Sequence, residues 1–361
     1  MSDAPLPAVN IDELETRAMT STESDLQLFH DCFAANGSPR SMEMLRWQYL
    51  APPGGPLLVD VAVTRGPHAR LAAIYAVFPV YLRAAGQRVL ALQSLNTLTD
   101  VAYRGQGLFV RMAKALYARA TEAGAQIVYG FPNGNSVHGF LKHLEWNSLG
   151  PLPLLVRPLR LGYVLRKFGA HTLAGILDVP LTLSRAPKLK PNFAFRTVQI
   201  IDTEFDRLWN AFAGTVGFAV DRDSSYLTWR LQRPGEQYET FALYENNVAI
   251  GLCIIGTTKG TDKKPVGKLM EHFYLPSHEF ASDLLVAEAI HRLGQKGCSV
   301  VWAWNCKHSK NHAALRKAKF FTPPAKREGD VIHVGARALT PLAGISDRSQ
   351  WYISLLDSDT D

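Results

Sequence analysis

The chain has 361 residues, of which 47% are hydrophobic and 20% charged, and its formal net charge is +7. This length exceeds one average domain, and the composition is that of a globular protein with a sizeable core. Apolar runs are too short to span a membrane, and the first residues lack the basic-then-apolar order of a secretory signal, so we expect a cytoplasmic protein. The four cysteines are scattered without metal-type spacing, which favours a reduced chain without a bound metal.

The first half of the chain alternates helical and strand patterns. Apolar residues at helical spacing predict helices at 24–35, 41–49, 104–123 and 136–144. In the third helix Phe109, Met112, Leu116 and Ala120 form one apolar stripe, and Gly124 ends the helix. Runs rich in β-branched and aromatic residues predict strands at 57–63, 71–84, 88–99 and 125–131.

The second half, from about Phe193, repeats this order. Its predicted elements are a hairpin over 238–256 turned at Asn246 and Asn247, a strand at 268–275, a helix at 279–296 and a strand at 299–304. Two pairs of segments match in the same order, with Trp47 opposite Trp229 and His138 opposite His312. We therefore predict two copies of one domain, at 1–157 and 193–361, joined by a linker at 158–192.

The linker has the pattern of a largely apolar, amphipathic helix. Its polar stripe consists of Arg160, Lys167, His171 and Asp178. One interpretation is a helix that packs against both domains. The other is a peripheral membrane contact through 158–178, in which flanking basic side chains touch anionic lipid. We do not expect nucleic-acid binding, because no cluster of basic and aromatic residues accompanies the positive charge.

The segment "YRGQGLF", residues 103–109, lies between a predicted strand and a predicted helix. Such a junction leaves backbone N–H groups without partners at the positive end of the helix dipole, where an anion binds. Glycine allows phosphate oxygens to approach the backbone closely. The segment has neither the Lys-Ser/Thr pair of a P-loop nor the third glycine of a dinucleotide-binding loop. It therefore predicts a phosphate site of another kind, with a plain tight turn as the alternative.

This segment resembles the acetyl-coenzyme A signature of the GNAT acyltransferase superfamily, Q/R-x-x-G-x-G/A. The matching residues are Arg104, Gly105, Gln106, Gly107 and Leu108, with Phe109 where glycine or alanine is usual. The resemblance implies that the amides of 105–109 hold the coenzyme A pyrophosphate. It also implies that the main chain of Thr97, Leu98 and Thr99 binds the pantetheine arm. Phe109 is expected to place a large ring beside the cofactor.

A second block, "FPNGNSVHGFLKHLEW", resembles the family's later strand-loop-helix pattern. It adds Asn133, Ser136, Phe140 and Lys142 to the implied cofactor site, and Trp146 closes the pattern. This form of the block, together with the ending "WYISLLDSD", resembles GNAT proteins encoded with polysaccharide and N-acyl amino acid pathways.

The resemblance implies an α/β (α+β) fold of two tandem GNAT-like domains, each a mixed, mostly antiparallel twisted sheet flanked by helices. The second copy has "LPSHEFASDLL" where the first has its glycine loop, without an arginine or a glycine pair. We therefore expect the second copy to be degenerate and to bind no cofactor.

The implied reaction is direct transfer of an acyl group from acyl-CoA, most simply acetyl-CoA, to a small-molecule amine. Phe140 stands where the family has a tyrosine acid, so the proton donor is open. The candidate catalytic residues are His138 and Asp100. The alternatives are a surface position for His138 and a helix cap for Asp100, and Ser136 is expected to cap its own helix. The acidic ending is expected to be disordered. The alternative is a tail that folds back, so that Asp357, Ser358 and Asp359 bind a cationic or hydroxyl-rich acceptor.

Three versions of this function stay open. The acceptor is an amino sugar or another small amine, or the enzyme uses a long-chain donor and forms an N-acyl amino acid. In the third version the chain is a non-catalytic acyl-CoA-binding module, which the missing acid at Phe140 would suit.

Overall fold

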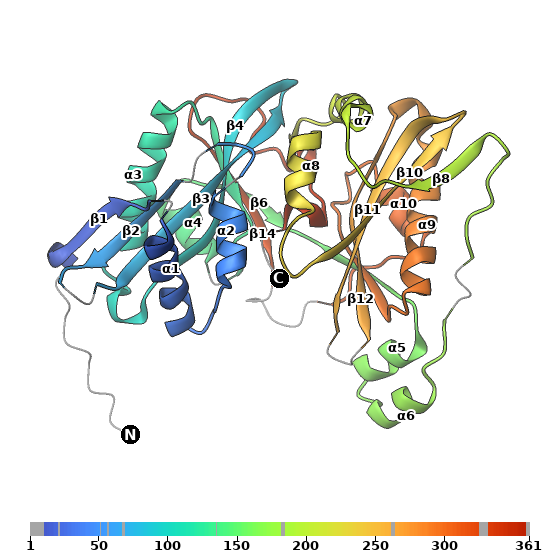
Figure 1. Cartoon of the computed structure of the whole chain (residues 1–361), viewed down its shortest axis with the longest axis horizontal. Helices are drawn as coiled ribbons and strands as arrows, with labels where there is room; N and C mark the ends of the chain where they lie inside the picture. The colour runs from blue at the N-terminus through green and yellow to red at the C-terminus, as the bar shows by residue number, and fades with distance from the viewer. Residues whose placement is uncertain are drawn as a thin grey trace. The chain divides into compact units, whose positions relative to one another are not determined.

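The computed structural model describes residues 11–20, 22–50, 52–55, 58–66, 69–134, 136–181, 185–260, 264–324 and 331–358. Within these ranges no helix is both long enough and apolar enough to cross a membrane. The chain divides into two compact units (Figure 1). Unit 1 comprises Met1–Leu82, Gln87–Gly150 and His333–Ser346, and unit 2 comprises Arg83–Gly86, Pro151–Ile332 and Asp347–Asp361.

Unit 1 is built on a twisted sheet with strand order β1-β2-β3-β4-β5-β14-β6. The strands are β1 (Leu14–Ala18), β2 (Leu58–Thr64), β3 (Leu71–Ala84), β4 (Gln87–Thr99), β5 (Ile127–Gly130), β14 (His333–Ala338) and β6 (Asn147–Pro151). β1, β2 and β3 pair antiparallel, β4 pairs with β5 in parallel, and β14 pairs antiparallel with β5.

Helices cover both faces of this sheet (Figure 1). α1 (Glu23–Ala35) and α2 (Met42–Leu50) pack on one face through Phe29, Leu45 and their neighbours. α3 (Leu108–Glu122) and α4 (Val137–His143) pack on the other through Leu116, Phe140 and theirs. β3 is buried almost throughout because both of its faces are covered, which explains its continuous apolar sequence.

Unit 2 repeats the arrangement with strand order β7-β13-β12-β11-β10-β8. The strands of this sheet are β7 (Leu154–Pro158), β8 (Phe193–Thr197), β10 (Gln237–Glu245), β11 (Val248–Lys259), β12 (Pro265–Tyr274) and β13 (Val300–Trp304). The short strand β9 (Phe218–Val220) also belongs to unit 2 but lies outside this sheet. The helices of unit 2 are α5 (Leu161–Lys167), α6 (His171–Ile176), α7 (Thr203–Ala213), α8 (Ser224–Arg230), α9 (Phe280–Gln295) and α10 (His312–Lys317). β12 and β13 form the parallel pair. The predicted repeat of one mixed α/β domain is confirmed.

The units exchange strands along the chain. β7 lies at the end of the predicted first repeat but pairs with β13 in unit 2. β14 lies within the predicted second repeat but pairs with β5 in unit 1. The boundaries 1–157, 158–192 and 193–361 stay a prediction about the repeats, whereas the compact units are each made of several chain segments.

Three sequence expectations differ from the structure. The helix predicted to begin at Arg104 begins at Leu108, because Gly105 and Gly107 adopt positive φ values of 78° and 75° that a right-handed helix excludes. The linker contains two short helices, α5 and α6, with Gly169 at a φ of 81° between them, rather than one amphipathic helix. The acidic ending is ordered through Ser358 and buried in unit 2.

Candidate functional site

The parallel strands β4 and β5 separate part of the way along β4. Their register runs from Ala91 opposite Ile127 to Ser94 opposite Gly130, whereas β4 continues to Thr99. Asn96 has a φ of +47°, a left-handed conformation that bends the strand just beyond the last pair. The final residues of β4 therefore present a strand edge that β5 does not cover. We call this opening the unit 1 splay.

Contacts from α2 hold the bend of β4 in place. The Asn96 side-chain amide donates hydrogen bonds to Gln48 Oε1 at 2.9 Å and to the Tyr49 hydroxyl at 2.8 Å. Gln48 and Tyr49 are both buried. The sequence alone does not indicate these contacts from α2. The bend itself has a signal, because asparagine is one of the few residues other than glycine that adopt left-handed backbone.

Thr97 adds a polar group to the uncovered part of β4. Its hydroxyl oxygen is buried and has no hydrogen-bond partner among the described residues. A buried hydroxyl is normally hydrogen-bonded, so this atom fits a bound polar ligand along the strand edge. Thr97 belongs, with Leu98 and Thr99, to the segment that the sequence assigned to the pantetheine arm.

The glycine loop lies between the splay and α3. A Cβ built on Gly105 or on Gly107 would meet no atom within 4 Å, so the backbone on this side of the loop is open. Arg104 Nε donates to the Thr99 carbonyl at 3.1 Å and ties the loop to the end of β4. A phosphate group can therefore approach the loop backbone closely.

The first turn of α3 provides donors at the same place. Its first hydrogen bond runs from Arg111 N to Gly107 O at 3.0 Å. The N–H groups of Leu108, Phe109 and Val110 therefore have no acceptor within the helix. Gly107 is the N-cap without a side-chain hydrogen bond, and the first turn has no acidic residue. The helix dipole and the neighbouring Arg104 both favour an anion here.

The Phe109 ring is partly buried, and its expected place beside the cofactor stays a prediction. The ring packs against Tyr75 and Phe140, with ring centroids 5.7 and 5.2 Å apart, and belongs to the edge of the α3-side core. The main-chain N–H of Phe109 thus stays at the helix start while the ring turns inward. Phe140 is buried against Trp146 with ring centroids 4.6 Å apart.

A buried hydroxyl network lies next to these rings. The Tyr75 and Tyr117 hydroxyls form a short hydrogen bond, Trp146 Nε1 donates to the Tyr117 hydroxyl at 3.1 Å, and Ser94 Oγ donates to the Tyr75 hydroxyl at 3.3 Å. Burial raises the pKa of Tyr117 to about 12, and burial raises the pKa of Tyr75 well above its usual value. The network begins at Ser94, the last paired residue of β4, and no local pattern in the sequence indicates it.

The two candidate catalytic residues occupy different settings. Asp100 caps the short 3-10 turn after β4, with Oδ1 accepting from Ala102 N at 2.9 Å and Oδ2 accepting from Asn36 Nδ2 at 3.1 Å. Both carboxylate oxygens therefore have structural partners. His138 is exposed on α4. Their catalytic roles stay predictions.

The remaining predicted site residues surround the start of α4. Asn133 Oδ1 accepts from Ser136 N at 3.1 Å, so Asn133, rather than the side chain of Ser136, satisfies the backbone at this helix start. Ser136 Oγ donates back to Asn133 O at 3.3 Å. Lys142 is exposed in the last turn.

Unit 2 has a comparable splay between β12 and β13, but its own chain fills it. The register of the two strands ends at Lys268 opposite Trp302, and β12 continues to Tyr274. Beyond the last pair, Asn311 Nδ2 donates to the His272 carbonyl at 2.7 Å, and the Tyr352 hydroxyl lies 3.1 Å from the same oxygen. The cavity that remains among these residues measures about 10 Å³, which is room for one water molecule.

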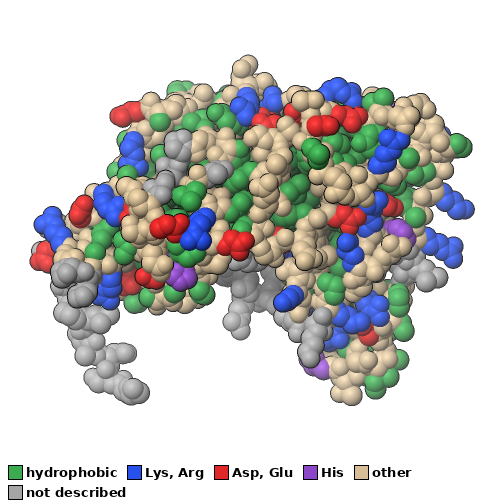
Figure 2. All heavy atoms as spheres, in the orientation of Figure 1, with side chains coloured by type: hydrophobic (Ala, Val, Ile, Leu, Met, Phe, Trp, Pro, Cys, Tyr) green, Lys and Arg blue, Asp and Glu red, His purple; other side chains and the backbone are tan. Residues whose placement is uncertain are grey.

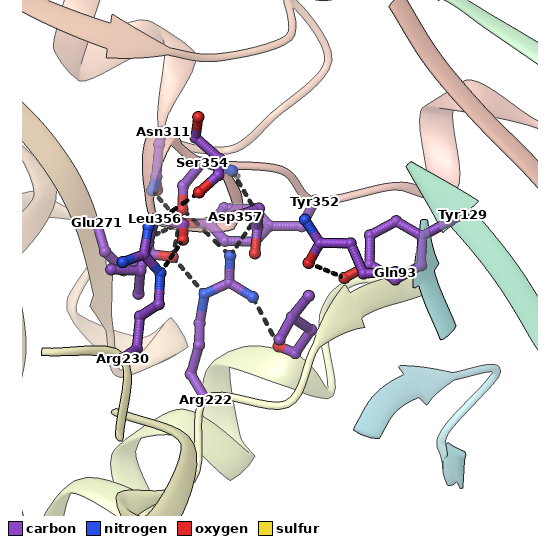
Figure 3. Close-up of polar contacts among 12 residues, drawn as sticks. Gln93, Tyr129, Arg222, Arg230, Glu271, Asn311, Tyr352, Ser354, Leu356 and Asp357 are labelled. Carbon is purple, nitrogen blue, oxygen red and sulfur yellow. Dashed lines mark hydrogen bonds and ion pairs between the residues drawn. The ribbon is translucent and has the colours of Figure 1, made fainter. Parts of the chain in front are cut away.

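A buried ionic cluster fixes the C-terminal segment 351–358 in this position (Figure 3). The guanidinium of Arg222 donates to Glu271 on β12 and, at 2.8 Å, to Asp357 Oδ2. The Tyr352 hydroxyl donates to Glu271, whose pKa is raised by burial against the opposing effect of Arg222. Arg230 also donates to the carbonyl of Leu356 at 2.9 Å.

The helix start in unit 2 is unsuited to phosphate. α9 begins after Glu279, which is its N-cap, and Asp283 lies in its first turn. Two carboxylates at the positive end of the helix repel an anion that the backbone would otherwise attract. That this copy binds no cofactor stays a prediction.

Comparison with known proteins supports this architecture. The family model of the acetyltransferase (GNAT) domain matches residues 15–147, which contain the splay and the glycine loop. No curated protein matches the chain in sequence.

Solved structures resemble the chain over nearly its whole length. Saccharomyces cerevisiae N-myristoyltransferase with bound myristoyl-CoA has a TM-score of 0.61 at 12% identity, covering 93% of this chain and 84% of that one. A GCN5-related N-acetyltransferase from Anabaena variabilis has a TM-score of 0.60 at 12% identity, covering 90% and 73%. A tandem GNAT protein from the clavulanic acid biosynthesis pathway has a TM-score of 0.56 at 12% identity, covering 91% and 99%.

At these identities the likeness to solved structures shows the fold, and the domain match adds the family of the first repeat. The chain therefore contains an acetyltransferase (GNAT) domain at residues 15–147 and has the fold of tandem GNAT proteins.

Proposed function

We propose that the chain is an acyl-CoA-dependent N-acyltransferase with one donor site, in unit 1. The observation that carries the proposal is the uncovered edge of β4, which leads directly into the open Gly105–Gly107 backbone. On this edge the Thr97 hydroxyl has no hydrogen-bond partner within the described part of the chain. A ligand that fits this site has amide donors and acceptors along an extended arm, which faces the edge of β4. It also has a negatively charged diphosphate at the end of that arm, which faces the glycine loop. Coenzyme A is such a molecule, so the residues present fit it.

Bound acyl-CoA supplies an activated acyl group as a thioester. The N–H groups at the start of α3 bind the diphosphate, and Arg104 adds positive charge beside them. The edge of β4 at Thr97–Thr99 orients the pantetheine arm through main-chain hydrogen bonds. These contacts hold the donor in one place, and positioning of this kind supplies much of the rate in transfer to an amine.

The buried tyrosines are poor acids for the leaving thiolate. An ordinary thiol has a pKa of about 8.5, so a phenol whose pKa is raised to about 12 holds its proton more tightly than a thiol does. Phe140 has no proton to give. We infer that the Tyr75–Tyr117 network stabilises the core below the splay and that the thiolate takes its proton from solvent. His138 and Asp100 stay the candidates for accepting the proton of the amine.

We propose a small amine, such as an amino sugar, as the acceptor and a short acyl group as the donor. A long-chain donor is the second candidate, because the structurally similar yeast N-myristoyltransferase holds myristoyl-CoA. The resemblance of the sequence to proteins of polysaccharide and N-acyl amino acid pathways supports testing both acceptor classes.

A thiol-release assay tests the proposal. The purified chain is incubated with acyl-CoA donors from acetyl to myristoyl and with a panel of amino sugars and amino acids. We expect amine-dependent release of free coenzyme A, and calorimetry is expected to give one donor bound per chain. Donor binding without release across the panel would instead show a non-catalytic binding module.

A further inference from the structure

Exposed apolar side chains are concentrated at one place in unit 2. Half of the large hydrophobic side chains that are exposed in the described part of the chain lie between residues 168 and 181. They are Phe168, Leu173, Ile176, Leu177, Val179 and Leu181. Phe168 is 85% exposed and Ile176 is 73% exposed. We call this group the α5–α6 surface. A cluster of this kind is rarely left in water without a partner.

The packing of α5 and α6 explains why these side chains face outward. A Cβ on Gly162 of α5 would lie 2.8 Å from the Ala174 carbonyl of α6, so the two helices are in close backbone contact there. Ala174 is buried in this contact. Leu173, Ile176 and Leu177 have helical spacing i, i+3 and i+4 and lie on one exposed face of α6.

An ion-pair network fixes the chain that follows α6. Asp178 Oδ2 accepts from Arg160 Nε at 3.1 Å and also contacts Lys264 Nζ. These partners lower the pKa of Asp178 against the effect of its burial, so the carboxylate stays ionised. The polar stripe predicted from the sequence is thus partly an internal ion pair that shapes the α5–α6 surface.

The chain segment that contains this surface is strongly positive. Residues 158–192 contain six basic residues and one acid, a net +5 of the chain's +7. The basic residues are Arg160, Arg166, Lys167, Arg185, Lys188 and Lys190. The single acid, Asp178, is already paired. Lys167, Arg185, Lys188 and Lys190 are exposed. Figure 2 shows hydrophobic and basic side chains together on the lobe that α5 and α6 form.

We propose that the α5–α6 surface docks on an anionic phospholipid membrane. A membrane interface accepts the aromatic and aliphatic side chains and attracts the surrounding cations at the same time. Self-association through this face would place two segments of net charge +5 against each other, and their repulsion disfavours such a dimer. Nucleic acid would pair with the lysines but would leave Phe168 and Ile176 in water. The proposal is independent of the acyl-transfer site in unit 1.

Vesicle flotation of the full chain tests this proposal. We expect the chain to float with vesicles that contain phosphatidylglycerol, weakly or not at all with pure phosphatidylcholine, and less at high salt. The double variant Phe168→Ser/Ile176→Ser is expected to lower the partition coefficient at least about tenfold. Lys188→Glu/Lys190→Glu is expected to lower binding to the anionic vesicles by a similar factor.

Ile200→Ser is the matched control, because Ile200 is 78% exposed in unit 2 but lies outside the α5–α6 surface. It should float like the unchanged chain. All variants should bind acyl-CoA equally, which separates this result from the proposed enzymatic function. Equal flotation of the double variant and the control would overturn the proposal. So would a concentration-dependent dimer in sedimentation velocity that the double variant abolishes.

Discussion

A methyl group on Gly130 would lie 2.9 Å from the Ser94 carbonyl oxygen, at the last paired position of β4 and β5. This close approach sets the point at which the two strands separate. Trp146 closes the other side, 3.4 Å from the same position, so a side chain on Gly130 has no room to turn away.

Gly130→Ala is therefore expected to lower the free energy of unfolding by about 1–3 kcal/mol, the usual cost of overpacking a core. Donor binding should weaken as well, because β4 shifts at the start of the splay. Urea denaturation and calorimetry measure the two effects. Gly139→Ala is the matched control, since its added methyl would meet only Phe109 at an ordinary 3.6 Å. An equal loss of stability in both variants would contradict this account.

Gly107→Glu places a carboxylate in the open side of the loop, where the diphosphate is proposed to bind. The affinity for acyl-CoA is expected to fall at least about tenfold, through charge repulsion and the loss of backbone approach. Gly235→Glu is the control, because Gly235 has a φ of 78°, close to the 75° of Gly107, and equally open space. Both variants should lose similar stability, and only Gly107→Glu should lose binding. Unchanged affinity of Gly107→Glu would mean that the donor binds elsewhere.

Tyr117→Phe removes the acceptor of the Trp146 indole and the partner of the Tyr75 hydroxyl. The expected result is a loss of about 1–3 kcal/mol in stability, because buried polar groups lose partners. Turnover with saturating donor and acceptor should change by less than about threefold, since a phenol with a pKa of about 12 is not the acid. A loss of kcat above about a hundredfold, with donor affinity intact, would show that Tyr117 protonates the thiolate after all.

Asp357→Ala leaves the buried Arg222 guanidinium with one carboxylate fewer. Breaking a buried ion pair in this way is expected to cost about 3–5 kcal/mol. Asp283→Ala is the control, because the exposed Asp283–Lys317 pair is worth at most about 1 kcal/mol. The measurement is the midpoint of urea unfolding. Similar midpoints for the two variants would mean that the C-terminal segment is not anchored through Arg222.

His272 makes the stability of unit 2 depend on pH. Burial lowers the pKa of His272 to about 3, so the folded chain keeps a neutral imidazole where the unfolded chain is protonated below about pH 6.5. Between these values the unfolded state binds more protons, and stability falls as the pH falls. His272→Gln is expected to reduce the slope of the unfolding free energy against pH between about pH 4 and 6 by the equivalent of about one proton. His143→Gln, at an exposed position, is the control and should leave this slope unchanged. Urea midpoints across that range provide the check.

Local patterns in the sequence predicted most of the elements and the loop. The continuous apolar run of β3 and the left-handed pair Asn246 and Asn247 in the second hairpin lie where the sequence placed them. The glycine loop was visible because its chemistry depends on adjacent residues. Each of these features is decided within a short window, which is why sequence reasoning succeeds there.

Contacts between distant residues were not predictable in this way. Tyr75 and Tyr117 meet across the core from a strand and a helix, and each looks like an ordinary apolar position in its own element. The last residues were expected to be disordered because they are acidic, and the burial of Asp357 depends on Arg222, which lies far away in the sequence. The turn of Phe109 into the core likewise depends on Tyr75 and Phe140, which lie elsewhere in the chain.

The pairing of β14 with β5 has a consequence for synthesis on the ribosome. β5 ends at Gly130, but its neighbour in the sheet, His333–Ala338, is translated only after nearly all of unit 2. Until then the nascent first half exposes a bare strand edge on β5, which is a site for wrong pairing with other chains. We expect that the growing polypeptide needs a chaperone or slow compaction until His333–Ala338 emerges, because the sheet of unit 1 is incomplete before that point.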